Sequence, residues 1–449
     1  MAILKTSVGF PDPRVTRRGF HRWLAAGGGV ALAACAAPGS EGEVGRTARP
    51  AVTLEYWSRF GPPIQDVEEQ RLPVFMEQFA PIKVERTTIT GGAAQLAPKL
   101  TTAFASNTAP DVFTIGSRAL VIYADPGWAL ALDAYPAVRK AAQDFFGPPQ
   151  QVATYQGKLY GLTYLVDARL TMWRKDLLAG EGLPTARQQL PNTWDEFRKT
   201  AKQLARYDGG QLVRAGFDIP KRGSNVFNLF MLIVAQQGKG FLNPQGTEVA
   251  FSGPEGERAL QMMVDFVHRD RLDAFERPDP PRGVPLLATP ITAGQWTNSQ
   301  SIRRVGEAQV DPAATLAPAF TPEFDTKPTA AAYLGGTWQL VNKAAKDVDA
   351  AIELLLFLAG RDHLLAVAEA TTSVPPLKSA GQADYLKNPL LRIFYDSLPY
   401  GWSVPQHPRF TEMFERIRDN NTDAMAQKKS AKAALTDSAA YCNALLAGG

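Results

Sequence analysis

The feature that most constrains the fold of this sequence is an alternation of strand-like and helix-like segments near its start. Strands are expected over residues 51–57, 83–90 and 110–115, and helices over residues 65–79 and 95–105. This β-α-β-α-β order predicts a largely parallel sheet covered by helices. Such sheets bind ligands at the carboxyl ends of their strands.

The length of the chain predicts more than one core. At 449 residues it exceeds what one hydrophobic interior usually serves, so two lobes of α/β type are expected. Further helices are expected over residues 193–207, 256–268, 347–359 and 430–447. The first of these opens on Thr193 and Glu196, which have the spacing of a capping box.

The N-terminus has the pattern of an export signal. Arg17 and Arg18 precede a short apolar stretch that ends in small residues at Ala34, which predicts a signal peptide over residues 1–34 and not a membrane-spanning helix. Residues 35–50 have the composition of a flexible tether. The signal region carries the whole net charge of +4, so the rest of the chain gives no electrostatic case for nucleic-acid binding.

Two resemblances refine the export prediction. The segment around Arg17-Arg18 resembles a twin-arginine signal, and Leu32-Ala33-Ala34-Cys35 resembles the lipobox of bacterial lipoproteins. They imply a protein exported to the extracytoplasmic side, periplasmic or cell-surface, and anchored to the membrane by lipid on Cys35. The other cysteine, Cys442, lies in an Ala- and Leu-rich helical pattern and is interpreted as a core residue.

Several motifs in sequence order resemble the bacterial extracellular solute-binding proteins of family 1, the maltose-binding type. They lie at residues 54–57, 109–113, 155–178, 182–184, 292–296 and 335–338. The resemblance covers nearly all of residues 51–449.

This resemblance implies an α/β, two-lobed periplasmic-binding-protein fold of type II. Each lobe would be a mostly parallel sheet flanked by helices, with a hinge of several strands between them. The lobes would comprise residues 51–166 plus 319–368 and residues 170–316 plus 372–449. A monomer of this kind captures a sugar or oligosaccharide in the interlobe cleft and delivers it to the permease subunits of an ABC importer, without a cofactor.

A sugar site needs flat aromatic surfaces and a few fixed polar groups, because a sugar presents both C–H faces and hydroxyls. Under the resemblance, the candidate ligand-binding residues are Trp57, Ser58, Arg59, Tyr164, Asp167, Arg169, Trp296, Gly335, Gly336, Trp338 and Trp402. Trp57 and Trp296 are the stacking candidates, and Trp296 is expected to touch ligand more than core. For each residue the alternative is a structural role, such as core packing or a hinge salt bridge.

Other functions stay open at this stage. His268, His363 and His407 are isolated in the sequence and no nucleophile or metal motif is found, so we expect neither catalytic residues nor a metal. A carboxylate pair could still make the protein a secreted carbohydrate hydrolase. Arg59 and Arg169 leave a sugar phosphate or a glycerol phosphate ester as an alternative ligand, and polyamines are a further one.

Overall fold

The strand and helix alternation expected for residues 51–115 is present in the computed structural model. The structure describes residues 50–89, 92–324 and 329–448. The expected signal peptide, the lipidation site Cys35 and the tether before Pro50 lie outside the described residues.

The strands are short apart from two that cross the molecule. They are β1 Val52–Ser58, β2 Ile82–Thr88, β3 Val112–Gly116, β4 Thr154–Tyr155, β5 Lys158–Leu159, β6 Gly161–Arg174, β7 Arg206–Asp208, β8 Gln211–Arg214, β9 Gly294–Asn298, β10 Leu316–Ala319, β11 Ala332–Val341 and β12 Gly401–Trp402.

The α-helices lie between and around these strands. They are α1 Ile64–Gln78, α2 Gly92–Ala105, α3 Leu120–Ala124, α4 Pro136–Ala142, α5 Gly147–Gln151, α6 Lys175–Gly180, α7 Trp194–Leu204, α8 Gly223–Gln236, α9 Pro254–His268, α10 Gln300–Glu307, α11 Pro312–Thr315, α12 Val348–Leu358, α13 Arg361–Thr371, α14 Pro389–Asp396, α15 Phe410–Met425 and α16 Ala431–Ala447.

One mixed sheet joins the main strands in the order β10-β6-β11-β3-β1-β2, with β9 beside β6 and β12 beside β11. The strands β1, β2 and β3 are parallel to one another, as the sequence predicts. The strand β6 instead pairs antiparallel with β9, β10 and β11, because the chain passes through this region in both directions. The mostly parallel arrangement therefore holds for the β1–β3 part, and the crossing part of the sheet is antiparallel.

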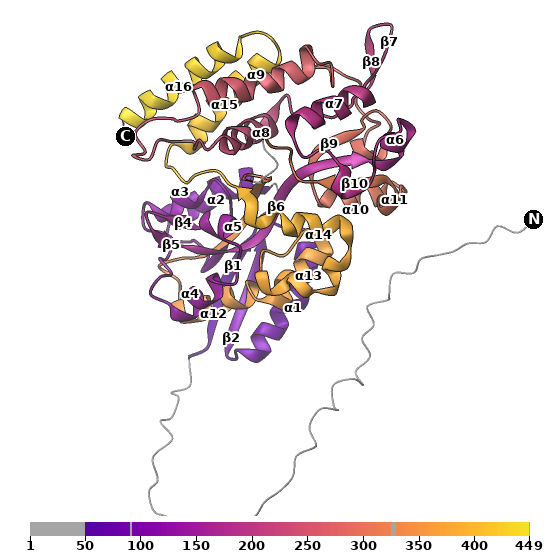
Figure 1. Cartoon of the computed structure of the whole chain (residues 1–449). Coiled ribbons are helices and arrows are strands. Elements are labelled where there is room, and N and C mark those ends of the chain that lie inside the picture. Colours follow the sequence, from indigo (N-terminus) through magenta and orange to yellow (C-terminus); the bar gives the residue numbers. More distant parts are fainter. Residues whose placement is uncertain (1–49, 90–91, 325–328, 449) are drawn as a thin grey trace, which may run out of the picture. The chain divides into compact units, whose positions relative to one another are not determined.

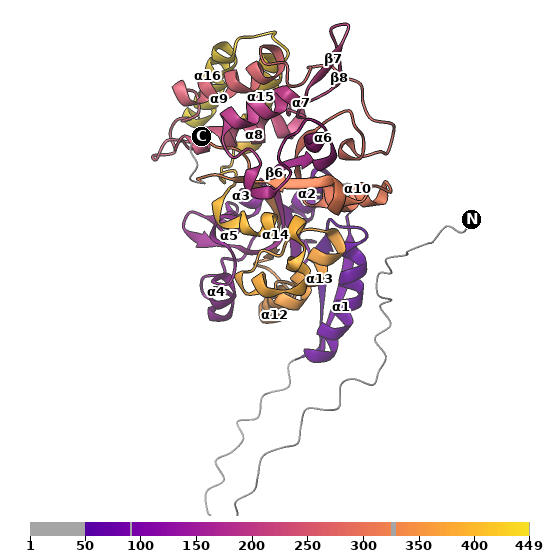
Figure 2. The ribbon, with the colours of Figure 1, turned by 45° about the vertical axis from the view of Figure 1, so that its right-hand side comes forward.

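Two main cores lie on either side of the crossing strands. The first includes Leu54, Phe75 and Leu355, and the second includes Phe197 and Phe230. Figure 1 shows β6 running from the elements around the first core to those around the second. Figure 2 shows α1 and α13 side by side over the first core. Both faces of β6 are covered along most of its length, which explains its nearly continuous burial.

Local features of the second core match the sequence. Thr193 Oγ1 accepts a hydrogen bond from the backbone N–H of Glu196 at 3.3 Å, which completes the capping box of α7. Trp194 is buried and donates through Nε1 to Gln236 Oε1 at 2.9 Å. Cys442 is buried in the same core. These residues are structural, as interpreted from the sequence.

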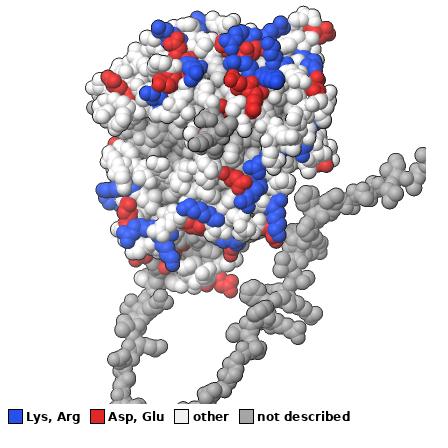
Figure 3. Space-filling model, viewed as in Figure 1, with Lys and Arg blue, Asp and Glu red and all other residues white. Residues whose placement is uncertain are grey.

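None of the helices in the described part of the chain combines the length and apolar character needed to cross a bilayer. Lys and Arg side chains are interspersed with Asp and Glu on the face shown in Figure 3. That face therefore lacks the continuous basic stripe typical of proteins that bind nucleic acid.

Candidate functional site

The crossing strands place several of the candidate residues on one face of the sheet. Residues directly opposite each other share a face, and so do alternate residues of one strand. The pairs are Asp167 with Gly335, Arg169 with both Tyr333 and Asn298, and Thr171 with Trp296. We call the set Asp167, Arg169, Trp296, Asn298, Tyr333 and Gly335 the crossing face.

The opposite side of the same strands is apolar and closed. Val166, Ala168 and Leu170 alternate with the residues of the crossing face and are buried in a third cluster, which also contains residues of α14. The strand alternation thus separates a packed side from a polar side, and only the polar side has the groups to bind a solute.

Asp167 is the centre of the polar contacts on the crossing face. Its Oδ1 accepts from Asn298 Nδ2 at 2.7 Å, and its Oδ2 accepts from Arg169 Nη2 at 2.9 Å. The Arg169 and Asp167 side chains are 20% and 29% exposed, so solvent reaches both partners. These groups are held in place by one another and keep further hydrogen-bonding capacity for a ligand.

Two adjoining cavities open beside this face. One of about 270 Å³ is lined by Arg169, Trp296, Asn298, Arg304 and Asn225, among others. The other, of about 290 Å³, is also lined by Asn225, Trp296 and Gln295, and adds Asp218. Together they provide a hollow of the size that small-molecule sites have.

Trp296 belongs both to these cavities and to the second core. Its side chain is only 3% exposed, and its Nε1 donates to Thr321 Oγ1 at 3.1 Å. The ring lies 6.1 Å from that of Tyr333. Most of its surface contacts protein, which differs from the expectation that it would touch ligand more than core, because the ring packs in the second core.

The two glycines at the crossing have different surroundings. A Cβ on Gly335 would lie 3.3 Å from Tyr333 Cε1 and 3.8 Å from Asp167 Cβ, so this residue lies directly under the crossing face. A Cβ on Gly336 would lie 2.1 Å from the Leu165 carbonyl oxygen, and its φ is +151°. Backbone packing therefore accounts for glycine at position 336.

The carboxyl end of β1 contributes Arg59. Its guanidinium is half-buried, and burial lowers its pKa to about 10 against the opposing influence of Asp167. Ser58, next to it, is fully buried and accepts from the Phe60 N–H at 3.4 Å. Trp57 packs against a cluster around α2 and β3. Of these three residues, Arg59 is the one with an electrostatic link to Asp167.

Tyr164 and Trp338 lie in the protein interior. The Tyr164 hydroxyl donates to Glu68 Oε1 at 2.6 Å, and Trp338 Nε1 donates to the Pro149 carbonyl at 2.9 Å. Each side chain is 1% exposed. Their polar atoms are satisfied within the protein, so neither has a contact to offer a ligand in this conformation.

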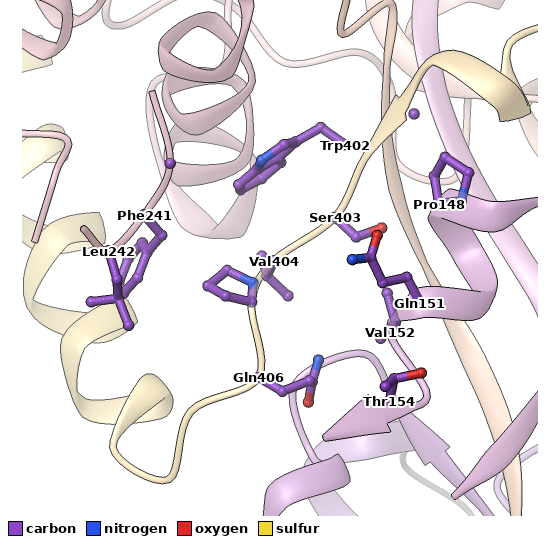
Figure 4. Close-up of a pocket in the computed structure, with 13 residues that line it drawn as sticks. Pro148, Gln151, Val152, Thr154, Phe241, Leu242, Trp402, Ser403, Val404 and Gln406 are labelled. Carbon is purple, nitrogen blue, oxygen red and sulfur yellow. The ribbon is translucent and has the colours of Figure 1, made fainter. Parts of the chain in front are cut away.

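Trp402 lines a separate cavity of about 470 Å³. Figure 4 shows Phe241 and Leu242 on one side of it and Gln151 and Thr154 on the other, with the segment 402–406 between them. Gln406 Nε2, at the end of this segment, donates to the Ser117 carbonyl at 2.8 Å. The structure therefore brings together Arg59, Asp167, Arg169, Trp296 and Gly335. Trp402 pairs with Tyr333 of the crossing face, with the two ring centres 6.2 Å apart, but the cavity that it lines is a separate one.

The candidates named from the sequence did not include Asn225, Asn298, Arg304 or Tyr333, which the structure brings to the site. Asn298 could have been found, because it follows Trp296 by two positions in a strand and so shares its face. Asn225 and Arg304 lie on helices that reach the site only in the folded protein, and the sequence carries no local signal for them. Within residues that the structure describes, no group of His, Cys, Asp and Glu side chains is arranged to hold a metal ion.

Comparison with solved structures shows the fold. The sugar-binding protein MalE of Xanthomonas citri matches with a TM-score of 0.78 at 21% identity, over 88% of this chain and 98% of that one. The cyclic α-maltosyl-1,6-maltose binding protein of Arthrobacter globiformis matches with a TM-score of 0.75 at 20% identity, over 89% and 100%. The α/β, two-lobed periplasmic-binding-protein fold predicted from the sequence is therefore confirmed.

Sequence comparison gives the family. A protein of Brucella abortus (strain 2308) named as a binding protein is 24% identical over 442 residues, 93% of this chain and 97% of that protein. A mannitol-binding protein of Pseudomonas aeruginosa is 28% identical over 162 residues, 35% of each chain. The family model described as bacterial extracellular solute-binding protein matches residues 61–363, well over half of the sequence. This chain is a member of the bacterial extracellular solute-binding protein family.

Proposed function

We propose that the protein captures a sugar or oligosaccharide outside the cytoplasm and delivers it to the permease subunits of an ABC importer. The observation that carries the proposal is the crossing face. It presents a carboxylate, an amide and a guanidinium beside Trp296, at two adjoining cavities that this residue lines. Paired hydrogen-bonding groups next to an aromatic side chain suit the hydroxyls and the C–H groups of a sugar.

The similar proteins support the carbohydrate class. The names of those relatives and structures describe binding of mannitol, of sugars and of a cyclic maltose oligosaccharide. In the proposal, the lobes have the boundaries expected from the sequence and close over the ligand about the crossing strands, which is a common motion of two-lobed proteins.

Export and anchoring form part of the same proposal. Membership in an extracellular family agrees with an exported protein. The Arg17-Arg18 pair and the Leu-Ala-Ala-Cys sequence support a twin-arginine route and a lipid on Cys35, and hence membrane anchoring. The proposal takes the anchored protein to be a monomer. Mass spectrometry of the protein purified from membranes tests this part of the proposal. We expect a mature N-terminus at Cys35 that carries added acyl mass. A protein in which the peptide bond between Ala34 and Cys35 is uncleaved would contradict it.

A thermal-shift screen of the exported protein tests the binding proposal. A ligand that binds only the folded state must raise the melting temperature, by an amount corresponding to roughly 3 kcal/mol at a hundred times its Kd. We expect a rise with one class of mono-, di- or oligosaccharide. A rise in melting temperature only with polyamines or glycerol phosphate would leave the family assignment unchanged, but would show that the ligand is not a sugar.

The hydrolase alternative is tested with the same samples. We propose that the protein turns over no substrate, since the Asp167 carboxylate is already paired with Arg169 and Asn298, and the Asp218 carboxylate with Arg277. Incubation with oligosaccharides followed by an assay for new reducing ends should give the same signal as a blank without protein. Release of reducing ends that grows with protein concentration would identify an enzyme.

A further inference from the structure

Most charged side chains around the site form ion pairs, but some positively charged ones do not. Arg169 pairs with Asp167, and Arg277 pairs with Asp218 at 2.9 Å. Deeper in the wall of the second cavity, Lys221 pairs with Asp273, and at its surface Arg222 pairs with Glu276. Asp279, which is exposed, also lines that cavity. Two arginines near these groups have no ion pair within the described part of the chain: Arg304, which lines the first cavity, and Arg59, whose charge is influenced by Asp167.

Arg304 points to the cavity beside the crossing face. It lines the 270 Å³ cavity together with Arg169, and its Nη2 donates only a long hydrogen bond, 3.4 Å, to Asn298 Oδ1. Burial of its head group and the positive charge of nearby Arg169 lower its pKa. Two guanidinium groups on one small cavity repel each other, and an anion between them would relieve that repulsion.

Arg59 adds a third guanidinium on the side of the first core. Asp167 is the carboxylate that acts on its charge, but Arg169 and Asn298 already use that carboxylate, and the buried Nε of Arg59 has no hydrogen-bond partner. Its guanidinium lies 4.9 Å from the ring centre of Phe60. A buried donor without a partner is unfavourable, so an acceptor supplied by a ligand would stabilise it.

We propose that the carbohydrate bound at the crossing face carries a negative charge, as a carboxylate or a phosphate ester. Arg304 and Arg59 bind the anionic group, while Asp167 and Asn298 bind hydroxyls. This inference rests on the proposed function, because it specifies the class of sugar that the same site takes.

Calorimetric titration with matched sugars tests it. The neutral sugars glucose and galactose are compared with glucuronate, galacturonate and glucose 6-phosphate, at low salt and again at high salt. We expect at least one acidic sugar to bind roughly ten- to a hundredfold more tightly than its neutral counterpart, the range expected for hydrogen bonds to charged groups. The advantage should shrink as salt is raised. The uronates and the phosphate ester distinguish the two sources of charge.

Two neighbouring arginines supply the matched variants. Arg304→Gln should abolish the preference for the acidic sugar, whereas Arg303→Gln should retain it, because Arg303 lies on the same helix but pairs with Glu307 at 2.6 Å. Melting temperatures of both variants check their folding. Equal or tighter binding of the neutral sugars overturns the inference and leaves the proposed function standing; a screen in which no carbohydrate of either kind binds overturns the proposed function itself.

Discussion

At the scale of single residues, Asp167 organises the candidate site. It accepts from both Arg169 and Asn298, so its loss would free two side chains at once. Asp167→Asn should lower carbohydrate affinity roughly tenfold or more, in line with charge-assisted hydrogen bonds, as measured by calorimetry. The matched control is Asp176→Asn, since Asp176 also pairs with an arginine two positions away, Arg174, at 2.6 Å. Equal effects of the two variants would mean that Asp167 acts only in folding.

Replacement of Trp296 should reduce the stability of the fold more than expected from the sequence, which predicts that this side chain touches ligand more than core. Its side chain is almost wholly buried and hydrogen-bonded to Thr321, so Trp296→Ala should lower the free energy of unfolding by about 3–5 kcal/mol. Denaturant titration without ligand measures this. Trp296→Phe keeps most of the buried surface and should lose much less. An Ala variant as stable as the parent protein would show that the ring contributes little to the core.

At the scale of elements, the pairing of β6 with β11 depends on one of two adjacent glycines. Gly336→Ala would place its Cβ against the Leu165 carbonyl and should cost about 2–4 kcal/mol of stability. Gly335→Ala would press only on Tyr333 and Asp167, and should therefore retain the fold while weakening ligand binding. Thermal melts and titrations of both variants separate the effects. The reverse pattern would contradict the described geometry of the crossing.

A buried polar network joins β1, α1, β6 and α13 and should make stability depend on pH. His363 contacts the Tyr164 hydroxyl at 3.2 Å, and Tyr164 in turn donates to Glu68. Burial, with a smaller contribution from Arg71, lowers the pKa of His363 from 6.5 to about 3.

Between these two values the unfolded chain binds a proton that the folded protein does not, so stability falls as the pH drops from about 6.5 toward 3. The loss should approach ~1.4 kcal/mol per pH unit. Denaturation of the protein and of His363→Gln at pH 7.5 and pH 5 checks this: the variant should lose less stability on acidification. Equal losses would show that His363 is not the group responsible.

At the scale of the whole molecule, sequence patterns could predict the alternating strands, the α7 capping box and the two cores, because each depends on local periodicity or on chain length. The antiparallel pairing of β6 with β9, β10 and β11 could not be predicted in this way, since it depends on which segments, distant in the sequence, pair with each other. Because the site also depends on contacts between distant segments, only some of its residues could be predicted from the sequence. Asp167 and Arg169 adjoin the crossing in the sequence, whereas Asn225 and Arg304 reach it only through the packing of α8 and α10.

The parts of the chain around the two cores also contact each other away from the crossing strands. Arg118 Nη2, after β3, donates to Asn228 Oδ1 of α8 at 3.0 Å, and its guanidinium lies 3.8 Å from the ring centre of Phe414. Opening of the proposed lobes would have to break these contacts. Arg118→Ala should therefore increase the radius of gyration of the ligand-free protein in X-ray scattering, and an unchanged radius would show that this contact does not restrain the lobes.

The most direct test of the central claim is a crystal structure of the protein with the carbohydrate identified in the thermal-shift screen. The account predicts ligand density over Asp167, Arg169 and Asn298, next to Trp296. Density in the cavity next to Trp402, with the crossing face filled only by solvent, would contradict it.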